Sequence, residues 1–280
     1  MKKYYITTPI YYVNDKPHIG HAYTTILADT LSRFRTLIGE QSFFLTGLDE
    51  HGLKVQQAAE KNKVTPEVHC DTMAPAFIEL WEKLNINYSD FIRTTEKRHT
   101  TIVQDILKQV YENGDIYQDE YEGWYSISEE RFITEKEVES GLFGEAKKIK
   151  EKNYFFKMSK YQSELIKKIE SDELSIQPKS RKNEVLGFLK QELSDLCISR
   201  PKSRLEWGIE IPFDKDYVTY VWFDALINYI SAPKYSEDNK NFKLHWPADV
   251  HLIGKDILTT HSVYWPTMLM SLNLPMPKAI

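Results

Sequence analysis

The segment that decides the fold is Thr7-Thr8-Pro9-Ile10-Tyr11-Tyr12-Val13-Asn14-Asp15-Lys16-Pro17-His18-Ile19-Gly20-His21. It follows the apolar, β-prone residues 4–6, and it precedes residues 22–37, where apolar side chains recur at nearly helical spacing. Aspartate and proline inside the segment are typical turn residues. The pattern predicts a strand, a long loop and a helix whose first turn carries His18 and His21.

The start of this predicted helix is suited to binding an anion. A helix N-terminus has unpaired N–H groups and a partial positive charge. His18 and His21 are three residues apart, so they share a face from which both can donate hydrogen bonds to a phosphate. Gly20 between them would let a nucleotide approach the backbone. This indicates phosphate chemistry without a Walker motif; the alternative is two surface histidines that happen to begin a helix.

Composition limits the classes of function. The 280 residues suffice for one large or two modest domains, and the net charge of −5 gives no overall basic character for gripping nucleic acid. Cys70 and Cys197 form neither a metal-type pair nor a disulfide framework. The N-terminus has no signal-peptide core, and no apolar run approaches the ~18–20 residues of a membrane span. We expect a cytoplasmic protein with no membrane partner.

Strand and helix patterns alternate in the first part of the chain. Strands are predicted at 41–46 and 89–93, a polar turn at 47–52, and helices at 53–61, 66–84 and 97–113. This alternation predicts an α/β fold with a Rossmann-like parallel sheet. Ligands of such sheets bind at the carboxyl ends of the strands, where His18, His21 and Asp49 all fall.

The pattern changes from residue 115 onward. A Tyr-, Trp- and acid-rich stretch is followed by a strand at 154–156 and helices at 160–169 and 183–193. Alternation returns with strands at 218–222 and 251–253 and helices at 224–231 and 257–272. We expect residues 1–113 and 217–280 to form two halves of one domain, with 114–216 inserted between them. Residues 277–280 have the pattern of a strand start, so we expect the natural chain to continue.

Five segments, in this order, resemble those of the class I aminoacyl-tRNA synthetases, and among these the methionyl-tRNA synthetases. They are Pro9-Ile10-Tyr11-Tyr12 with His18-Ile19-Gly20-His21, Gly47-Leu48-Asp49-Glu50-His51-Gly52, Cys197-Ile198-Ser199-Arg200 with Trp207-Gly208, Tyr220-Val221-Trp222-Phe223-Asp224-Ala225, and Ile253-Gly254-Lys255-Asp256 with His261 and Trp265-Pro266. The resemblance covers essentially the whole chain. It implies a Rossmann-like catalytic domain split by a connective-peptide insertion.

The resemblance also implies a reaction in two steps. The carboxylate of L-methionine attacks the α-phosphorus of ATP to give methionyl-adenylate, and the methionyl group then passes to the terminal adenosine of tRNA(Met). His18 and His21 would be the catalytic residues, as donors that stabilise the negative charge spread over the phosphoryl oxygens. Mg²⁺ would accompany ATP, held mainly by its phosphates.

By resemblance, Asp49 binds the ammonium group of methionine and Arg200 belongs to the same site. The thioether side chain would contact Tyr12, Trp222, Ala225, Tyr229, Ile257, His261 and Trp265, with Pro9 and Ile10 on the loop side. Aromatic rings suit a thioether, since sulfur–aromatic contacts contribute about 0.3–1.5 kcal/mol each. ATP would bind at His18, Gly20, His21, Gly254 and Asp256. Without the resemblance, the tryptophans and His261 would be interpreted as core residues, Asp49 as a turn former and Arg200 as an ion-pair partner.

The chain departs from the family pattern at three points. The Lys-Met-Ser-Lys-Ser signature is expected beyond residue 280; residues 157–160 spell its first four letters but lie inside the insertion, so we reject them as the catalytic loop. The run that matches the family's zinc knuckle, residues 125–130, has no cysteine, and we predict a metal-free insertion without zinc. The anticodon-binding domain is missing. We therefore expect a truncated fragment with impaired activity.

Two alternatives stay open. The first is another class I synthetase, specific for leucine, isoleucine, valine or cysteine, or a His-x-Gly-His nucleotidyltransferase. The insertion is too short for the editing domain of the branched-chain enzymes, and nucleotidyltransferases lack the segments around Trp222 and His261. The second is a non-catalytic module that binds methionine or nucleotide.

Overall fold

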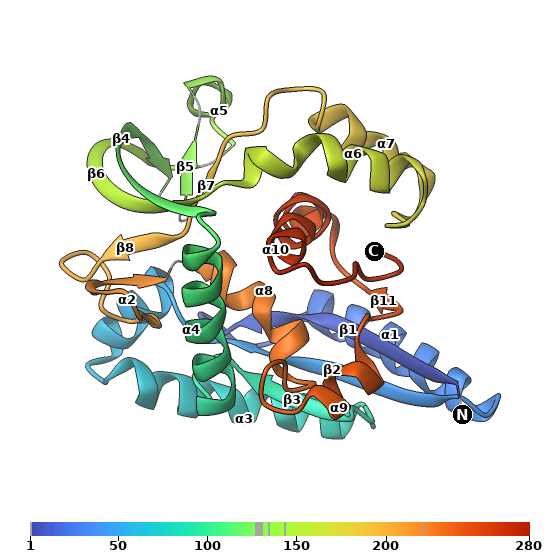
Figure 1. Ribbon diagram of the computed structural model, residues 1–280. Helices are drawn as coiled ribbons and strands as arrows, with labels where there is room; N and C mark the ends of the chain where they lie inside the picture. Colours follow the sequence, from blue (N-terminus) through green and yellow to red (C-terminus); the bar gives the residue numbers. More distant parts are fainter. Residues whose placement is uncertain (1, 127–130, 134, 143, 220) are drawn as a thin grey trace.

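The structure is a computed structural model that describes residues 2–126, 131–133, 135–142, 144–219 and 221–280 (Figure 1). The first elements are β1 (Lys3–Tyr12), α1 (Ile19–Leu37), β2 (Gln41–Asp49), α2 (Leu53–Asn62), α3 (Pro66–Lys83), β3 (Asp90–Arg93), α4 (Lys97–Glu112), β4 (Ile116–Ser126), β5 (Arg131–Ile133) and α5 (Glu135–Ser140). Next come β6 (Ala146–Phe156), η1 (Met158–Tyr161), α6 (Gln162–Glu170), α7 (Lys179–Phe188), β7 (Leu196–Cys197), β8 (Ser199–Pro201), β9 (Glu210–Ile211) and β10 (Asp214–Thr219). The last are α8 (Val221–Ser231), α9 (Asn239–His245), β11 (Val250–His251), η2 (Lys255–Ile257), η3 (Thr260–Tyr264) and α10 (Trp265–Ser271).

The central sheet has the strand order β11-β1-β2-β3, and every neighbouring pair is parallel. Helices cover both faces, with α1 behind the sheet and α4 and α8 in front of it (Figure 1). This confirms the predicted α/β class with a parallel sheet. The strand order reverses between β1 and β11, which is where ligands bind in open sheets of this kind.

Alternation along β1 assigns its side chains to the two layers. Tyr4 and Ile6 pack with Ala28 of α1, whereas Tyr5 belongs to the core that includes α4 and α8. Successive strand residues point to opposite faces, so each layer receives every second side chain. We call the two sides of the sheet the α1 face and the α8 face.

An irregularity in β1 changes which side chains point to which face. Pairing with β2 is regular from Lys3 to Thr7 and resumes at Ile10, so β1 has one residue more than β2 between these points. Pro9 has no N–H for the ladder, which explains the interruption. After it, Ile10 packs on the α8 face, and the hydroxyl of Tyr11 bonds Thr25 of α1. The predicted long loop from residue 7 is therefore wrong: β1 continues to Tyr12.

Other predicted boundaries also need correction. Strand β2 runs to Asp49 into the predicted turn, where Gly47 lies so close to β3 that an added Cβ would be 2.0 Å from the carbonyl oxygen of Ile92. Residues 221 and 222 begin helix α8 and do not end a strand. The predicted helix 257–272 is broken into η2, a π-helical turn η3 and α10, and α9 was not predicted.

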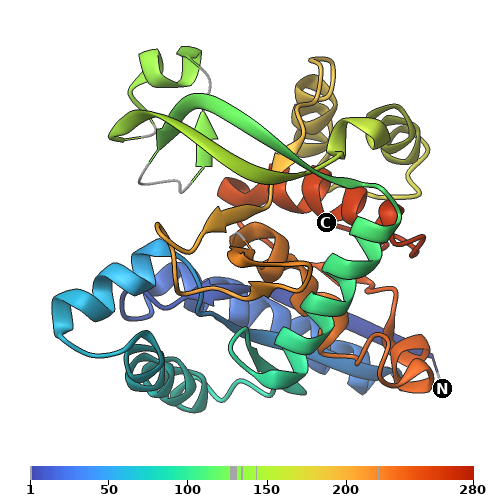
Figure 2. The ribbon, with the colours of Figure 1, turned by 60° about the vertical axis from the view of Figure 1, so that its left-hand side comes forward.

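Strands β4 to β6 and helix α5 lie above the central sheet and its helices in Figure 2. Strands β4 and β6 pair antiparallel from Ile116–Phe156 to Ser126–Ala146, in a sheet of order β5-β4-β6-β7. A second sheet has the order β8-β10-β9, and β10 spans the boundary expected at residues 216–217. The main hydrophobic core is continuous across this region, with the Phe156 and Phe223 rings 6.4 Å apart.

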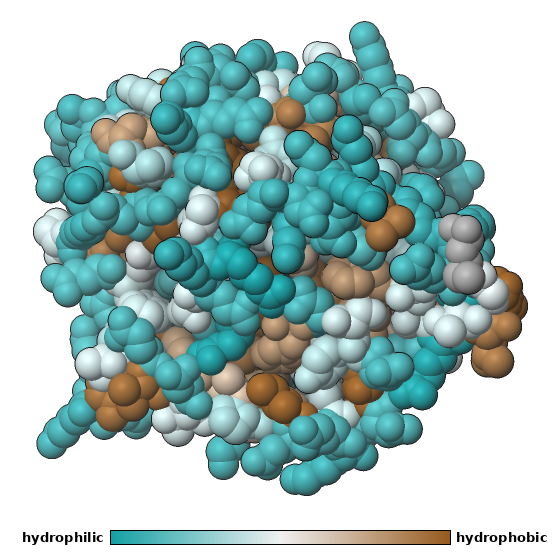
Figure 3. Space-filling view, turned by 60° about the horizontal axis from the view of Figure 1, so that its bottom comes forward, coloured by the Kyte–Doolittle hydropathy of each residue, from teal (hydrophilic) through white to brown (hydrophobic). Residues whose placement is uncertain are grey.

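The face seen from below in Figure 3 is largely hydrophilic, with apolar side chains in scattered groups. None of the helices in the described part of the chain combines the length and the apolar character needed to cross a bilayer.

Candidate functional site

The two motif histidines cap helix α1. His18 was predicted to lie in the first turn, but it is the N-cap residue. His21 is the third helical residue and does lie in the first turn, as predicted. The Nδ1 atom of His18 accepts a hydrogen bond from the Gly20 N–H at 3.1 Å, and the Nδ1 atom of His21 accepts one from the His18 N–H at 3.3 Å. The imidazole rings stack with centroids 3.8 Å apart. The two histidines thus form a capping box, a role that usually falls to hydroxyl and carboxyl side chains.

This capping box fixes the tautomers of the two rings. Because each Nδ1 accepts from a backbone N–H, each neutral imidazole carries its proton on Nε2. Burial, and secondarily the neighbouring His18 ring, lowers the pKa of His21 to about 4, so His21 is neutral at pH 7. His18 is exposed and His21 half-buried. The site therefore offers Nε2–H donors at the N-terminus of α1.

Gly20 has an intramolecular reason to be glycine. A Cβ on this residue would lie 2.9 Å from Cε1 of His18, closer than side-chain contacts normally allow. Any other residue would displace the His18 ring that caps the helix. Gly20 thus has a packing role in addition to the predicted close approach of a nucleotide.

Loops from β1 and β11 meet at the point where the strand order reverses. The β1 loop leads to His18, and the β11 loop leads to Gly254 and Asp256 at the start of η2. Asp256 is exposed and Ile257 half-buried, and an added Cβ on Gly254 would lie 2.5 Å from the Asp256 carboxylate. The predicted ATP residues thus lie on two loops at the carboxyl edge of neighbouring strands.

The end of β2 brings Asp49 next to Tyr12. The two residues are register partners in adjacent parallel strands, so their side chains leave the sheet on the same side. Asp49 is buried, and Tyr12 is half-buried. By alternation from Leu45, the Asp49 side chain leaves β2 on the α8 face, whereas the Tyr12 ring also packs against the separate cluster that contains Leu48 and Val55. Pro9 lies just before Ile10 in the same stretch of β1.

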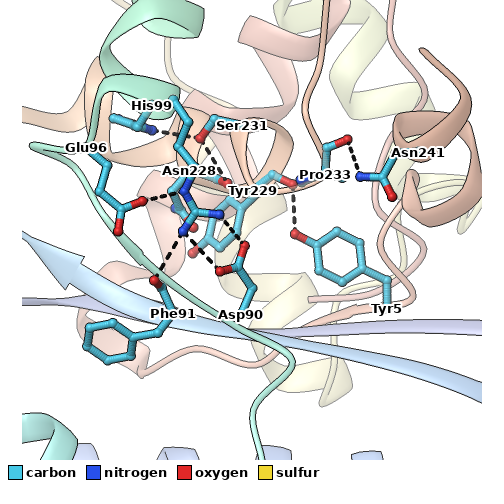
Figure 4. A network of polar contacts seen from close by, with 11 residues as sticks. Tyr5, Asp90, Phe91, Glu96, His99, Asn228, Tyr229, Ser231, Pro233 and Asn241 are labelled. Carbon is cyan, nitrogen blue, oxygen red and sulfur yellow. Dashed lines mark hydrogen bonds and ion pairs between the residues drawn. The ribbon is translucent and has the colours of Figure 1, made fainter. Parts of the chain in front are cut away.

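Helix α8 carries three of the predicted methionine residues. Trp222, Ala225 and Tyr229 are spaced by three and four residues and so share one face of the helix. Trp222 is half-buried, whereas Ala225 and Tyr229 are buried. The Tyr5 hydroxyl donates to the Tyr229 carbonyl at 2.8 Å, which ties α8 to β1 (Figure 4). Tyr220, just before the helix, lies outside the described residues.

Tyr229 and His261 form a buried hydrogen-bonded pair. The Nδ1–H of His261 donates to the Ile257 carbonyl at 2.9 Å, so its Nε2 accepts from the Tyr229 hydroxyl at 2.7 Å. Burial lowers the pKa of His261 to about 4 and raises the pKa of Tyr229. Both groups are neutral at pH 7. The Trp265 ring lies 5.8 Å from that of Tyr229, so these three predicted residues are brought together.

The sequence analysis missed a fourth ring in this group. The His251 ring of β11 lies 4.2 Å from that of Tyr229, tilted by 30°, and His251 accepts from the Trp265 indole N–H at 3.2 Å and bonds Thr7 at 2.8 Å. Burial, and secondarily His261, lowers the pKa of His251 well below its usual value. The available signal was a histidine inside an apolar strand of the central sheet.

Arg200 lies in a different setting. It belongs to β8, and its guanidinium donates to the Ser199 carbonyl at 2.7 Å and contacts the Cys197 thiol at 3.1 Å. The same group lies 4.8 Å above the Tyr125 ring. A small cavity of about 50 Å³ joins Arg200 and Tyr125 to Leu53 at the start of α2. These contacts connect Arg200 to β4 and β7.

The lysines of residues 157–160 are engaged within the chain. The Lys157 ammonium donates to the Gly114 carbonyl at 2.7 Å, and that of Lys160 to the Asp115 carboxylate at 2.6 Å. These contacts agree with rejecting the segment as a catalytic loop. In the part of the chain that the structure describes, no three His, Cys, Asp or Glu side chains are grouped to hold a metal; residues 127–130 of the predicted knuckle position lie outside that part.

Comparison with known proteins identifies the family. The sequence profile of the "tRNA synthetases class I (M)" matches residues 4–142 and 139–280. The methionine–tRNA ligase of Clostridium acetobutylicum is 52% identical over 285 residues, which cover 100% of this chain. The chain belongs to the class I methionyl-tRNA synthetase family. The methionine–tRNA ligase of Bacillus subtilis is 46% identical over 294 residues, and the chain spans 44% of the length of either relative.

Solved structures of the methionyl-tRNA synthetase family agree with this fold. The Mycobacterium tuberculosis methionyl-tRNA synthetase in complex with methionyl-adenylate gives a TM-score of 0.95 at 40% identity, with 100% of this chain and 56% of that chain covered. The free form of the same enzyme gives 0.84 at 38% identity, with 100% and 55% covered. These matches favour the methionyl branch over the other class I branches and the nucleotidyltransferases.

Proposed function

We propose that this chain carries the ATP-dependent activation of L-methionine to methionyl-adenylate, from which the methionyl group passes to tRNA(Met). The observation that supports it most is the arrangement at one sheet edge. Two Nε2–H donors at the start of α1 lie at the carboxyl end of β1, and a buried carboxylate, Asp49, ends the adjacent strand. A phosphate binder and an ammonium binder are thus adjacent, as amino-acid activation requires.

His18 and His21 act as hydrogen-bond donors through their Nε2–H groups in this proposal. When the methionine carboxylate attacks the α-phosphorus, negative charge develops on the phosphoryl oxygens. Donors that are already oriented stabilise that charge without reorganisation, and the capping box orients both Nε2–H groups. Because the pKa of His21 is about 4, its ring is neutral at pH 7. The single ring proton stays on Nε2, where it can be donated in a hydrogen bond.

Methionine lies on the α8 face in this proposal. Its ammonium group binds Asp49, and its side chain packs against Tyr12, Ala225 and Tyr229, with Trp222 at the rim. His261 and Trp265 support the Tyr229 ring from behind through the contacts described above. The other proposed methionine residues are Pro9, Ile10, Ile257 and Arg200.

ATP lies across the β1 and β11 loops, with its phosphates at His18, Gly20 and His21 and its adenosine at Gly254 and Asp256. The exposed Asp256 carboxylate suits ribose hydroxyls as an acceptor. Mg²⁺ would be held mainly by the ATP phosphates, since carboxylate clusters for a dedicated site are absent from the described residues. Zinc has no role in the proposal, and the cytoplasm is the proposed location.

We also propose that residues 114–216 are a connective insertion between the halves 1–113 and 217–280. The chain lacks a Lys-Met-Ser-Lys-Ser signature, so the 280-residue chain should bind methionine but activate it slowly. Rapid methionine-dependent exchange of pyrophosphate into ATP by this chain would contradict the second part of this proposal.

Calorimetric titration tests the function. L-Methionine should bind and L-leucine should not, and Trp222→Ala should abolish methionine binding while the chain keeps its melting temperature. A chain that binds ATP but neither amino acid would favour the nucleotide-binding alternative. Equal affinity for the two amino acids would favour another class I specificity.

A further inference from the structure

A buried hydrogen bond joins two segments that lie far apart in the sequence. The Nδ1 atom of His51, in the loop after β2, lies 2.8 Å from the Oδ2 atom of Asp224 in α8. The side chains are 7% and 0% exposed. Since an ionised carboxylate only accepts, the His51 Nδ1–H donates. Shielding from water makes this contact stronger than a surface pair would be.

Each partner is next to residues proposed to bind methionine. His51 follows Asp49 by two residues, and Asp224 lies between Trp222 and Ala225. The hydrogen bond therefore links the segment that would hold the ammonium group to the helix that would hold the side chain. These two segments bind opposite ends of the same small molecule, so the distance between them determines which side-chain length fits.

The loop that carries His51 is held from its other sides. The Trp207 ring lies 5.4 Å from that of His51, and its indole N–H donates to the Glu50 carbonyl. The Gly52 N–H donates to the Trp207 carbonyl at 3.1 Å. The Glu50 carboxylate accepts from Arg93 at 2.7 Å. His51 is thus attached to a rigid loop and can transmit its position to α8.

Helix α8 has separate contacts along its length. Near its carboxyl end, Ser231 bonds His99 of α4 at 2.7 Å, and the Tyr229 carbonyl accepts from Tyr5 (Figure 4). The bond to His51 adds to the core packing of Phe223 and Leu226 in holding the amino-terminal part of α8, where Trp222 lies. Loss of that bond should leave the carboxyl end in place and allow the amino end to move.

We propose that His51 is a positioning residue that sets the distance between Asp49 and the Trp222–Ala225 part of α8, and so selects the side-chain length of the amino acid. This rests on the proposed methionine activation. His51 acts through Asp224 and need not touch the substrate itself.

Two substitutions of similar polarity test the proposal. In His51→Asn the amide nitrogen takes the place of Nδ1 and can reach Asp224, whereas in His51→Gln it takes the place of Nε2 and cannot. His51→Gln should weaken methionine binding about tenfold in calorimetry and leave ATP binding within about twofold. It should also reduce the preference for methionine over L-ethionine, which is one methylene longer, about fivefold. His51→Asn should retain the parent values within about threefold.

A remote control is Ser32→Ala, which removes the 2.8 Å bond between Ser32 and Ser42 at the opposite end of β2. It should change neither affinity nor preference. Equal behaviour of the Asn and Gln variants would overturn the proposal, and so would a Gln variant that weakens methionine and ATP alike or keeps the preference over ethionine.

Amide hydrogen exchange separates this proposal from the proposed function. His51→Gln should accelerate exchange at residues 222–226 and leave α10 unchanged, and His51→Asn should not, with or without ligand. If the parent chain binds no methionine, the proposed function fails, and the exchange pattern still decides whether His51 positions α8. Unchanged exchange in the Gln variant would overturn the positioning role.

Discussion

Two pairs of histidines in this molecule differ in which ring nitrogens remain available. His18 and His21 lie at the carboxyl edge of the sheet, and each uses Nδ1 to accept from the backbone. His251 and His261 lie beneath the α8 face, and both of their ring nitrogens are engaged with Thr7, Trp265, Ile257 or Tyr229. All four are histidines near one site, yet their surroundings give them different capacities.

The difference distinguishes histidines that can hydrogen-bond to a ligand from histidines that only support the shape of the site. The capping pair keeps Nε2–H groups directed away from its own backbone contacts, so it can act on a ligand's oxygens. The buried pair has no nitrogen left for a ligand, so it can only hold aromatic rings in place. A histidine's role here follows from its unused donor and not from its proximity to the site.

The largest expected effect is the acid sensitivity of the buried histidines. Burial lowers the pKa of His99 and His261 to about 4 and holds the pKa of His251 well below its usual value, whereas about 6.5 is expected in the unfolded chain. The unfolded state therefore binds more protons below pH 6.5, and stability is full above that pH and falls as pH drops toward 4. Each such group contributes about 1.4 kcal/mol per pH unit in this window, and His21, whose pKa is also lowered to about 4, adds to the slope.

Urea unfolding at pH 7, 6 and 5 measures this slope. His261→Gln should reduce the slope by about 1.4 kcal/mol per pH unit, because one proton-uptake site is removed. A stability that is constant from pH 7 to pH 5 would show that these rings are not held neutral.

The next largest effect concerns Trp265, whose ring lies beside the buried pair His251 and His261. Trp265→Ala removes a fully buried indole and should lower the free energy of unfolding by about 3–5 kcal/mol. The exposed Tyr23 on α1 is the control, and Tyr23→Ala should change it by less than about 0.5 kcal/mol. Similar losses in the two variants would contradict the assignment of Trp265 to the core.

The capping pair should affect chemistry and not stability. His18→Asn keeps a good N-cap but removes the Nε2–H donor, so single-turnover adenylate formation should fall about 10²–10³-fold while stability changes by less than about 1 kcal/mol. His18→Gln places an amide N–H near the Nε2 position and should recover part of the rate. A rate unchanged in the Asn variant would remove His18 from the proposed chemistry.

The smallest effect is expected at the bond between Tyr229 and His261. Tyr229→Phe leaves the Nε2 atom of His261 buried without its donor, which should lower the free energy of unfolding by about 1–3 kcal/mol. Thermal and urea unfolding measure this. A Phe variant as stable as the parent would mean that the ring, and not its hydroxyl, holds His261.

The sequence was a good guide to element type and a poor one to element ends. Helix α3 begins after its Thr65 cap as predicted, because capping is a local signal. The extent of β1 was missed because Pro9 and the turn residues after it suggested a loop, whereas pairing with β2 extends the strand to Tyr12. Trp222 was assigned to a strand, since β-branched and aromatic residues precede the helix that contains it.

For the site, sequence patterns found residues that sit in motifs and missed residues that act through partners. His18 and His21 follow the end of β1 and Asp49 is the last residue of β2, at the edge where parallel sheets gather ligand groups. The bond from His51 to Asp224 spans 173 residues and leaves no local trace in the sequence. His251 was missed for the same reason, because its partners Thr7 and Trp265 come from opposite ends of the chain.

The most direct measurement is a crystal structure with a non-hydrolysable methionyl-adenylate analogue. The account predicts that the ammonium group lies on Asp49, the thioether on the α8 face against Ala225 and Tyr229, and the phosphate within hydrogen-bonding distance of Nε2 of His18 and His21. A methionine side chain on the α1 face, or a phosphate away from both imidazoles, would contradict it.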